Sequence, residues 1–190
     1  MKLTLLTPAD YVTTRWSGGT TTQLAIAPAG AVYAERDFLW RVSSATVELD
    51  ESDFTPLPDY RRFISTVRGD MSLSHGGGAE LTLHPGDVHE FDGGEDTHSR
   101  GRCTDFNLML RKGKADGTMR ALRLSGKREL TPDAGMETLL LYCASGSGSV
   151  RCGGEERRFA AGESVLAEDC TEALTVEGEG LFFAARIWLL

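Results

Sequence analysis

Residues able to bind an anion are concentrated in a few stretches of the first 111 residues. The loop WSGGTTTQL (16–24) combines a tryptophan, two glycines, three threonines and a glutamine. Glycines let a ligand approach the main chain, and the hydroxyl and amide groups offer hydrogen bonds. An ordinary surface loop has a similar composition, so whether this stretch binds a ligand depends on the strands around it.

Two arginines lie inside apolar strands, Arg41 in FLWRVS and Arg62 in RRFISTV. A buried arginine needs a partner for its charge. Arg41 either pairs with a core carboxylate such as Asp105, which is the more common arrangement, or faces a cavity and meets an anionic ligand. Arg62 poses the same choice. Asp105 and Asn107 share one face of the strand TDFNLML, which suits a cavity wall or a satisfied polar network.

The four histidines, at positions 75, 84, 89 and 98, all lie near turns in the first half of the chain. HPGDVHEF (84–91) is either half of a metal site or a tight turn that carries two imidazoles. A zinc or iron site needs three or four ligands converging at ~2.0–2.3 Å. Strand alternation does not aim His84 and His89 at one point, so we predict no metal and no other cofactor.

Alternation of apolar and polar residues dominates the chain and predicts an all-β fold. In TDFNLML the alternate residues from Thr104 to Leu110 form a mostly apolar face. In FLWRVSSATVEL the apolar phase reverses near Ser43–Ser44, which predicts a bulge or a change of partner sheet. No long helical pattern occurs, and short helices are expected only near Pro8 or within 113–130.

Residues 69–88 and 146–165 form an internal repeat. Three features recur in the same order: Gly69 matches Gly146, Gly76–Gly78 matches Gly153–Gly154, and Gly86-Asp87 matches Gly162-Glu163. The second copy contains no histidine, so the Gly-acid turn is predicted to be structural in both copies. Repetition of such a unit implies two similar β units.

The repeated unit resembles the core of a cupin, a small jelly-roll barrel. The resemblance implies an all-β bicupin, with two double-stranded β-helix barrels and few short helices. The expected division is an N-terminal barrel with the pocket at 1–111, a connector at 112–135, and a C-terminal half at 136–190. Strands from elsewhere in the chain are expected to complete this last part.

Net charge is −8 and the isoelectric point is about 5.0. An acidic surface repels phosphate, so nucleic acid and anionic membranes are not expected partners. The stretch 111–129 holds seven Lys/Arg and is interpreted as a solvated connector, with a protein-binding surface as a third functional alternative. No apolar run approaches the ~20 residues of a membrane span. We expect a cytoplasmic protein whose four cysteines are free thiols.

Two of these strands together resemble the HutD/Ves family of bicupins. FLWRVSSATV, followed by a phenylalanine, a proline turn and an arginine, is similar to one family strand, and TDFNLMLR (104–111) to another. The N-terminal loop departs from the family pattern, with Ser17 near an asparagine position and Gln23 at a glutamate position. Gly94 stands where the family has an aspartate.

The resemblance implies a small-molecule-binding protein, a regulator or sensor in histidine catabolism. Its ligand would be a small carboxylate such as urocanate or formylglutamate. A metal-dependent cupin isomerase or oxygenase is the alternative, and a homodimer stays open. The candidate ligand-binding residues are Trp16, Thr21, Gln23, Trp40, Arg41, Ser43, Arg62, Asp105, Asn107 and Met109.

Overall fold

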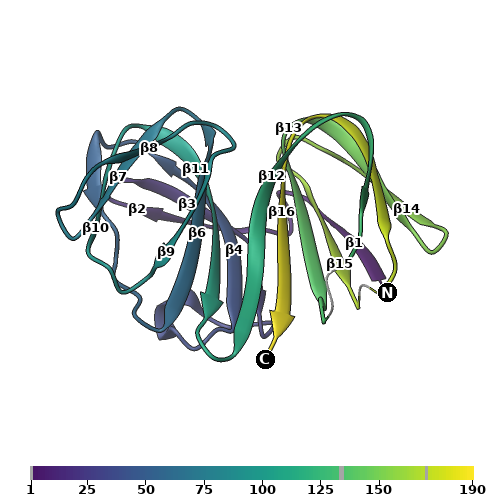
Figure 1. Ribbon diagram of the computed structural model, residues 1–190, viewed down its shortest axis with the longest axis horizontal. Coiled ribbons are helices and arrows are strands. Elements are labelled where there is room, and N and C mark those ends of the chain that lie inside the picture. The colour runs from purple at the N-terminus through teal and green to yellow at the C-terminus, as the bar shows by residue number, and fades with distance from the viewer. Residues whose placement is uncertain (1, 133–134, 170) are drawn as a thin grey trace. The chain divides into compact units, whose positions relative to one another are not determined.

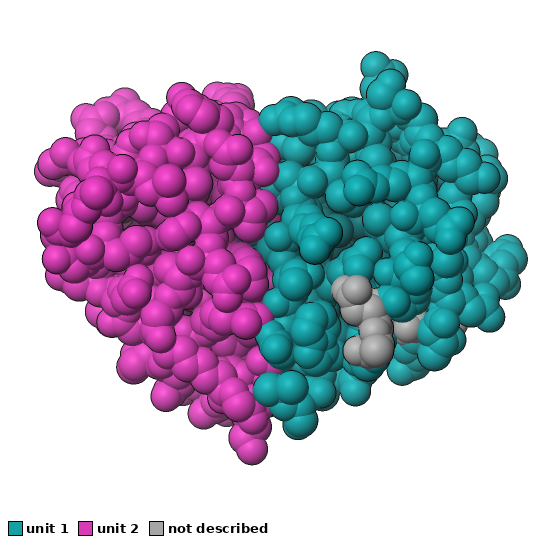
Figure 2. Space-filling model, viewed as in Figure 1, with its two compact units in different colours: residues 1–11, 116–190 teal, residues 12–115 magenta. Residues whose placement is uncertain are grey.

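The computed structural model describes residues 2–132, 135–169 and 171–190. The prediction of an all-β fold is confirmed: β-strands dominate, with a single 3₁₀ turn, η1 (Tyr33–Glu35), among the described residues. The chain divides into two compact units (Figure 2): unit 1 is Met1–Tyr11 with Asp116–Leu190, and unit 2 is Val12–Ala115. The described residues form no helix long and apolar enough to span a membrane.

Unit 2 contains two antiparallel sheets (Figure 1). The larger sheet has the strand order β2 (Val12–Trp16), β3 (Gly19–Ala27), β4 (Trp40–Val47), β11 (Cys103–Arg111), β6 (Tyr60–Arg68), β9 (Val88–Asp92). The smaller has the order β5 (Glu51–Asp53), β10 (Thr97–Arg100), β7 (Met71–His75), β8 (Leu81–Leu83). Ile64 of the larger sheet packs in one cluster with Leu73 and Leu83 of the smaller, so burial of these faces holds the sheets together.

Unit 1 is one sheet wrapped around its own core. Its order is β1 (Lys2–Leu6), β15 (Ser164–Glu168), β13 (Thr138–Cys152), β16 (Leu174–Leu189), β12 (Ala115–Leu130), with β14 (Glu155–Ala160) beside β13. The first part of β13 pairs with β15 and the last part with β14. A register irregularity against β16 lies between them, at Cys143/Ser145. Because Leu139 and Val150 from the two parts share one core cluster, the strand bends around that core.

The expected connector at 112–135 is largely a strand. Leu122 and Leu124 of β12 lie in the core of unit 1, and Arg123 between them is exposed. The charges that indicated a solvated connector therefore belong to the outer face of an amphipathic strand. The expected helices near Pro8 and within 113–130 are absent, and the N-terminal strand β1 belongs with the C-terminal unit.

The internal repeat is confirmed at its Gly-acid turns. The Asp87 carboxylate accepts a hydrogen bond from the His84 amide at 3.0 Å, three residues earlier. The Glu163 carboxylate accepts the equivalent bond from the Ala160 amide at 2.8 Å. His84 of HPGDVHEF thus contributes its backbone amide to the turn, and the second copy forms the same turn without a histidine.

The glycine before each acid explains the rest of the turn. Gly86 has φ of 93° and Gly162 has φ of 89°, a region that side chains with a Cβ rarely adopt. Their amides donate to the carbonyl oxygens of Thr66 at 3.0 Å and Cys143 at 2.9 Å. The two units therefore share this turn down to its backbone hydrogen bonds.

The expected irregularity near Ser43–Ser44 lies on the neighbouring strand. β4 pairs with β11 without a register shift, whereas β3 is irregular between Gln23 and Ala25, opposite Ser43 and Val42. The reversal of apolar phase in β4 has another cause. Its inward face is polar at Arg41 and Ser43 because that part of the face borders a cavity.

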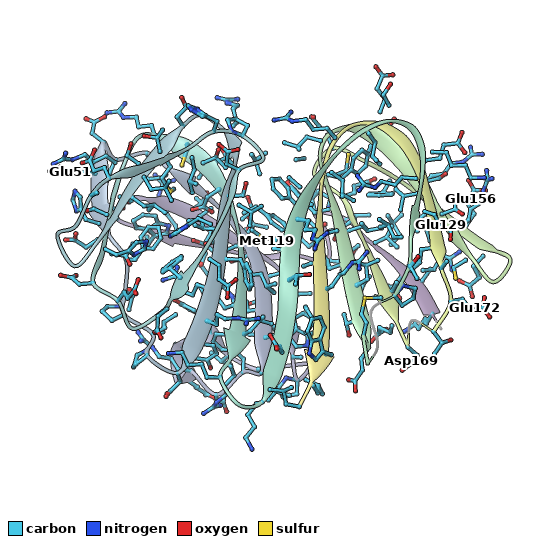
Figure 3. All side chains as sticks on the ribbon, viewed as in Figure 1. Glu51, Met119, Glu129, Glu156, Asp169 and Glu172 are labelled. Carbon is cyan, nitrogen blue, oxygen red and sulfur yellow. The ribbon has the colours of Figure 1, made fainter. Side chains whose placement is uncertain are left out.

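The three described cysteines at 103, 143 and 152 are buried free thiols, and Cys170 lies outside the described residues. Burial raises the pKa of Cys103 to about 12 and that of Cys143 to about 11. Both thiols therefore stay protonated and serve as core residues. Acidic side chains such as Glu51 of β5 project from the outside of their unit (Figure 3).

Candidate functional site

A cavity of about 330 Å³ lies inside unit 2. Its walls come mainly from strands of the larger sheet, with β5 and the residues after it on another side. Eight of the ten candidate residues line it: Trp16, Thr21, Arg41, Ser43, Arg62, Asp105, Asn107 and Met109. Residues from separate parts of the chain thus meet around one space large enough for a small organic ligand.

The other two candidate residues lie behind or away from the wall. The side-chain oxygen of Gln23 accepts a hydrogen bond of 2.8 Å from Nε of Arg41, so Gln23 supports a lining residue. Trp40 precedes Arg41 on β4, and successive side chains of a strand point to opposite faces. Trp40 is buried on the face away from the cavity, and the expectation that it walls the pocket is not met.

Strand register places the polar side chains in rows across the sheet, on β4, β11 and β6 (Figure 1). Arg41 and Arg62 both pair with Met109, one from each side. Two residues along β11, Asn107 stands opposite Ser43 of β4. Since residues directly opposite in a sheet share a face, the register alone brings the two arginines to the same wall.

Arg41 is held by neutral groups. Besides the bond to Gln23, its Nη1 donates to the hydroxyl of Ser43 at 3.3 Å. The guanidinium stacks over the ring of Tyr33, with its carbon 4.3 Å from the ring centre. The alternative in which Arg41 pairs with Asp105 does not occur, since no ion pair joins these described residues. Asp105 therefore acts on this positive charge through space, without forming an ion pair with it.

Arg62 is also buried, and it has fewer hydrogen-bond partners than Arg41. Its side chain lies between two aromatic rings, 4.9 Å from the centre of Phe54 and 5.1 Å from that of Phe91. Its Nε is buried and has no hydrogen-bond partner. Burial lowers the pKa of both arginines, because the charged form has lost solvent. An anion in the cavity beside these guanidinium groups would offset this cost.

Asp105 is the acid of the wall and is only 4% exposed. Its Oδ1 accepts hydrogen bonds from the Ala45 amide at 2.8 Å and from Nδ2 of Asn107 at 2.7 Å. Burial raises its pKa to about 7, and the two bonds and both arginine charges oppose this shift without cancelling it. The cavity therefore sets two guanidinium groups against two carboxyl groups, the partly ionised Asp105 and Asp53, which also lines it.

The histidines lie outside this wall, and among the described residues none lines the cavity. His84 forms an exposed ion pair with Asp70 at 3.0 Å. Nδ1 of His98 donates a 2.7 Å hydrogen bond to the carboxylate of Asp53, a residue of the cavity rim. The described residues contain no group of three or more histidine, cysteine, aspartate or glutamate side chains suited to a metal ion.

His75 and His89 form a pair that the sequence did not indicate. Their Nε2 atoms are 2.9 Å apart and join β7 of the smaller sheet to β9 of the larger. Nδ1 of His75 faces the hydroxyl of Thr97 at 2.9 Å, and this hydroxyl donates to the Glu95 carbonyl. Thr97 therefore accepts from His75, whose proton is on Nδ1, and His89 is the donor of the shared bond.

Sequence reasoning missed Thr14, Tyr33 and Phe54, which also line the cavity. Thr14 had a detectable signal, since it alternates with Trp16 beside a glycine turn. Tyr33 and Phe54 lie in or beside short irregular segments, and their positions depend on the guanidinium groups that stack on them.

The turn after Trp16 shows why its two glycines are needed. A Cβ at Gly18 would lie 2.0 Å from the indole ring of Trp16, so a glycine is required for the ring to fold over the turn. A Cβ at Gly19 would lie 1.9 Å from the Thr46 carbonyl oxygen. Gly18 therefore leaves room for the indole over the turn, and Gly19 allows the close approach of the β4 backbone at Thr46.

The fold with this internal cavity is of the cupin type, and solved structures agree. A conserved protein of unknown function from Pseudomonas aeruginosa PAO1 matches with a TM-score of 0.85 and 25% identity, covering 99% of this chain and 100% of its own. The nickel(II) complex of the bacterial pirin YhhW from Escherichia coli matches at 0.68 and 8% identity, covering 97% and 98%. The similarity to the pirin, at 8% identity, shows a shared fold and nothing more.

The chain belongs to the HutD family, whose model matches residues 8–184. HutD from Pseudomonas fluorescens SBW25, in a formate condition, has a TM-score of 0.82 and 20% identity, and each chain is covered completely, at 100%. The resemblance found in the sequence motifs is thereby confirmed. A comparison with curated proteins finds no match.

Proposed function

We propose that this protein is a bicupin that binds a small carboxylate and acts as a regulator or sensor in histidine catabolism. The observation that carries the binding proposal is the pair of buried arginines, Arg41 and Arg62, that line one cavity. A carboxylate is the natural partner of a guanidinium group.

The charge and the size of the cavity support a small acid. Arg41 and Arg62 are the only cationic side chains among its described lining residues. A volume of about 330 Å³ is near the lower end of ligand pockets. Urocanate and formylglutamate, each with about a dozen non-hydrogen atoms or fewer, suit a pocket of this size.

The regulatory role and the bicupin architecture have separate support. The shared Gly-acid turn of the two units, with equivalent carboxylate-to-amide bonds, favours descent of both from one barrel-forming unit. Membership of the HutD family supports the proposed link to histidine catabolism.

Thermal stability in the presence of trans-urocanate, N-formyl-L-glutamate or L-histidine tests the binding proposal. A ligand that binds the native state raises the melting temperature, and the increase grows with the ratio of ligand concentration to Kd. We expect at least one of the two carboxylates to stabilise the wild type and to lose this effect in Arg62→Ala. If none of the three stabilises the wild type more than the variant, the carboxylate pocket is wrong.

A matched control separates loss of the site from loss of charge. Arg102 is an exposed arginine of unit 2 that pairs with Asp50 at 2.9 Å and does not line the cavity. Arg102→Ala removes the same charge from the same unit, so it is expected to keep the ligand-dependent stabilisation.

A further inference from the structure

The two carboxylate oxygens of Asp105 have different surroundings. Oδ1 accepts both hydrogen bonds, from the Ala45 amide and from the Asn107 side chain. Oδ2 accepts no hydrogen bond from the described residues, although the side chain is almost fully buried and lines the cavity. Oδ2 is not among the enclosed unpartnered side-chain atoms, so it is open to the cavity, where a donor on the ligand can reach and stabilise it.

Asp105 and the two arginines stand at different positions along the strands that line the cavity. Met109, which stands between Arg41 and Arg62 in the register, is four residues further along β11 than Asp105. Four residues of a strand span ~13 Å between Cα atoms. The long arginine side chains shorten this separation: Nη1 of Arg41 reaches the hydroxyl of Ser43, which stands opposite Asn107, two residues from Asp105. A ligand that fills the cavity can therefore place an anion at one end and another group near Asp105.

The two ends also differ in chemistry. The Arg41–Met109–Arg62 row offers hydrogen-bond donors and positive charge. The row at Asp105 has Ala45 and Thr21 opposite in register, so Asp105 provides its only charge. This polarity runs along the strands and gives a bound molecule one preferred direction.

We propose that Asp105 is a specificity residue, whose Oδ2 selects carboxylates that also carry an N–H or O–H hydrogen-bond donor away from the acid group. This inference rests on the proposed function and narrows it to a class of ligand. An ionised carboxylate accepts hydrogen bonds and donates none, so a ligand acceptor at this place would meet repulsion. Burial raises the pKa of Asp105 to about 7, and its ionised form predominates above that pH.

A pair of planar acids of equal size tests the proposal at about pH 8.5, where a group with a pKa of about 7 is ionised. The probes are 3-(1H-pyrrol-2-yl)acrylate, with a ring N–H, and 3-(furan-2-yl)acrylate, with a ring oxygen at the same position. Titration calorimetry measures both affinities for the full-length protein. We expect the pyrrole acid to bind about tenfold to a hundredfold more tightly, the range of a hydrogen bond to a charged group.

Asp105→Asn assigns the preference to this residue. The Asn side-chain oxygen must accept from the Ala45 amide and Asn107, which leaves its NH₂ group where Oδ2 was. A donor then faces the ligand, so the preference for the pyrrole acid is expected to disappear or reverse. Asp50→Asn is the matched control, because Asp50 is exposed, pairs with Arg102 and is not in the cavity wall.

The outcomes are distinguishable. Equal affinities for the two acids, or a preference for the furan acid in the wild type, overturn the role of Asp105 but leave carboxylate binding intact. A preference that persists in Asp105→Asn also overturns it. If neither acid binds and no carboxylate stabilises the wild type, the proposed function itself fails. The wild-type comparison decides even if the variant does not fold.

Discussion

The side-chain amide of Gln23 holds the guanidinium of Arg41 through a 2.8 Å hydrogen bond from Nε to Oε1. The support is neutral, so the arginine keeps its whole positive charge for the cavity. The family pattern expected from the sequence has a glutamate at this position. A glutamate there would place an anion directly against Arg41.

Gln23→Glu is therefore expected to weaken carboxylate binding by about tenfold, or ~1–2 kcal/mol, because the new carboxylate neutralises Arg41 and repels the ligand. Calorimetric titration with trans-urocanate at low salt measures the change. Thr13→Glu adds the same charge to the same hairpin, where Thr13 faces Thr22 and not the cavity. Equal affinities in Gln23→Glu and the wild type would show that Arg41 does not contact the ligand acid.

Carboxylate binding is expected to depend on pH through Asp105. An anionic ligand disfavours the ionised form of Asp105, so binding takes up a proton when Asp105 is ionised in the free protein. With a pKa of about 7 in the free protein, affinity should fall as pH rises through 7 and level off below it. Titrations of an acid without a donor, such as acetate, in buffers of different protonation enthalpy measure this uptake. The Asp105→Asn variant should show a flat profile.

The His75–His89 pair predicts loss of stability in acid. Burial is the largest cause that lowers the pKa of His89 below its usual 6.5, followed by the neighbouring His75. The unfolded chain then binds more protons than the native protein below about pH 6.5, so stability falls as pH decreases through this window. Urea unfolding of the wild type and His89→Gln at several pH values measures the difference, which should shrink in acid.

His84 provides a control, because its contribution to stability has the opposite pH dependence. The bond to Asp70 raises the pKa of this exposed histidine, so its contribution is present at low pH and is lost as pH rises. His84→Gln should therefore reduce stability more in acid than in base. A stability difference for His89→Gln with the same pH trend as His84→Gln would contradict the buried pair.

Gly18→Ala tests how the indole of Trp16 is positioned. The new Cβ would overlap the ring, so Trp16 must turn away from its present place at the cavity. We expect a change in tryptophan emission and weaker binding of planar acids, with a stability loss of ~1–3 kcal/mol at most. Ser17→Ala, in the same turn, removes only a hydroxyl. Unchanged emission and affinity in Gly18→Ala would mean that the indole does not form part of the binding wall.

The strands of the site could be predicted from local patterns, but the orientation of each side chain required the period of two to be applied strictly. Trp40 and Arg41 are neighbours, so both cannot face one cavity, and only Arg41 does. Asp105 and Asn107 are two apart and do share a face, joined by a 2.7 Å hydrogen bond. On both strands, side chains two residues apart share a face and adjacent side chains do not.

Contacts between distant segments could not be predicted in this way. The strand β12 was not predicted from its sequence. Its buried and exposed positions do not alternate regularly, and its many charged residues make the stretch resemble a polar connector. The encounter of His75 with His89 depends on the packing of two sheets, which no single segment encodes. Tyr33 and Phe54 likewise reach the cavity only because buried guanidinium groups select aromatic neighbours.

The pairing of β1 with β15 has a consequence for how the protein is made. Leu6 meets Ser164, so β1 has no strand partner until β15, far along the chain, has been synthesised. Unit 2 is a single uninterrupted run of chain and can complete its ligand cavity during that interval. A receptor for a small acid would then exist on the nascent chain before the other half has folded.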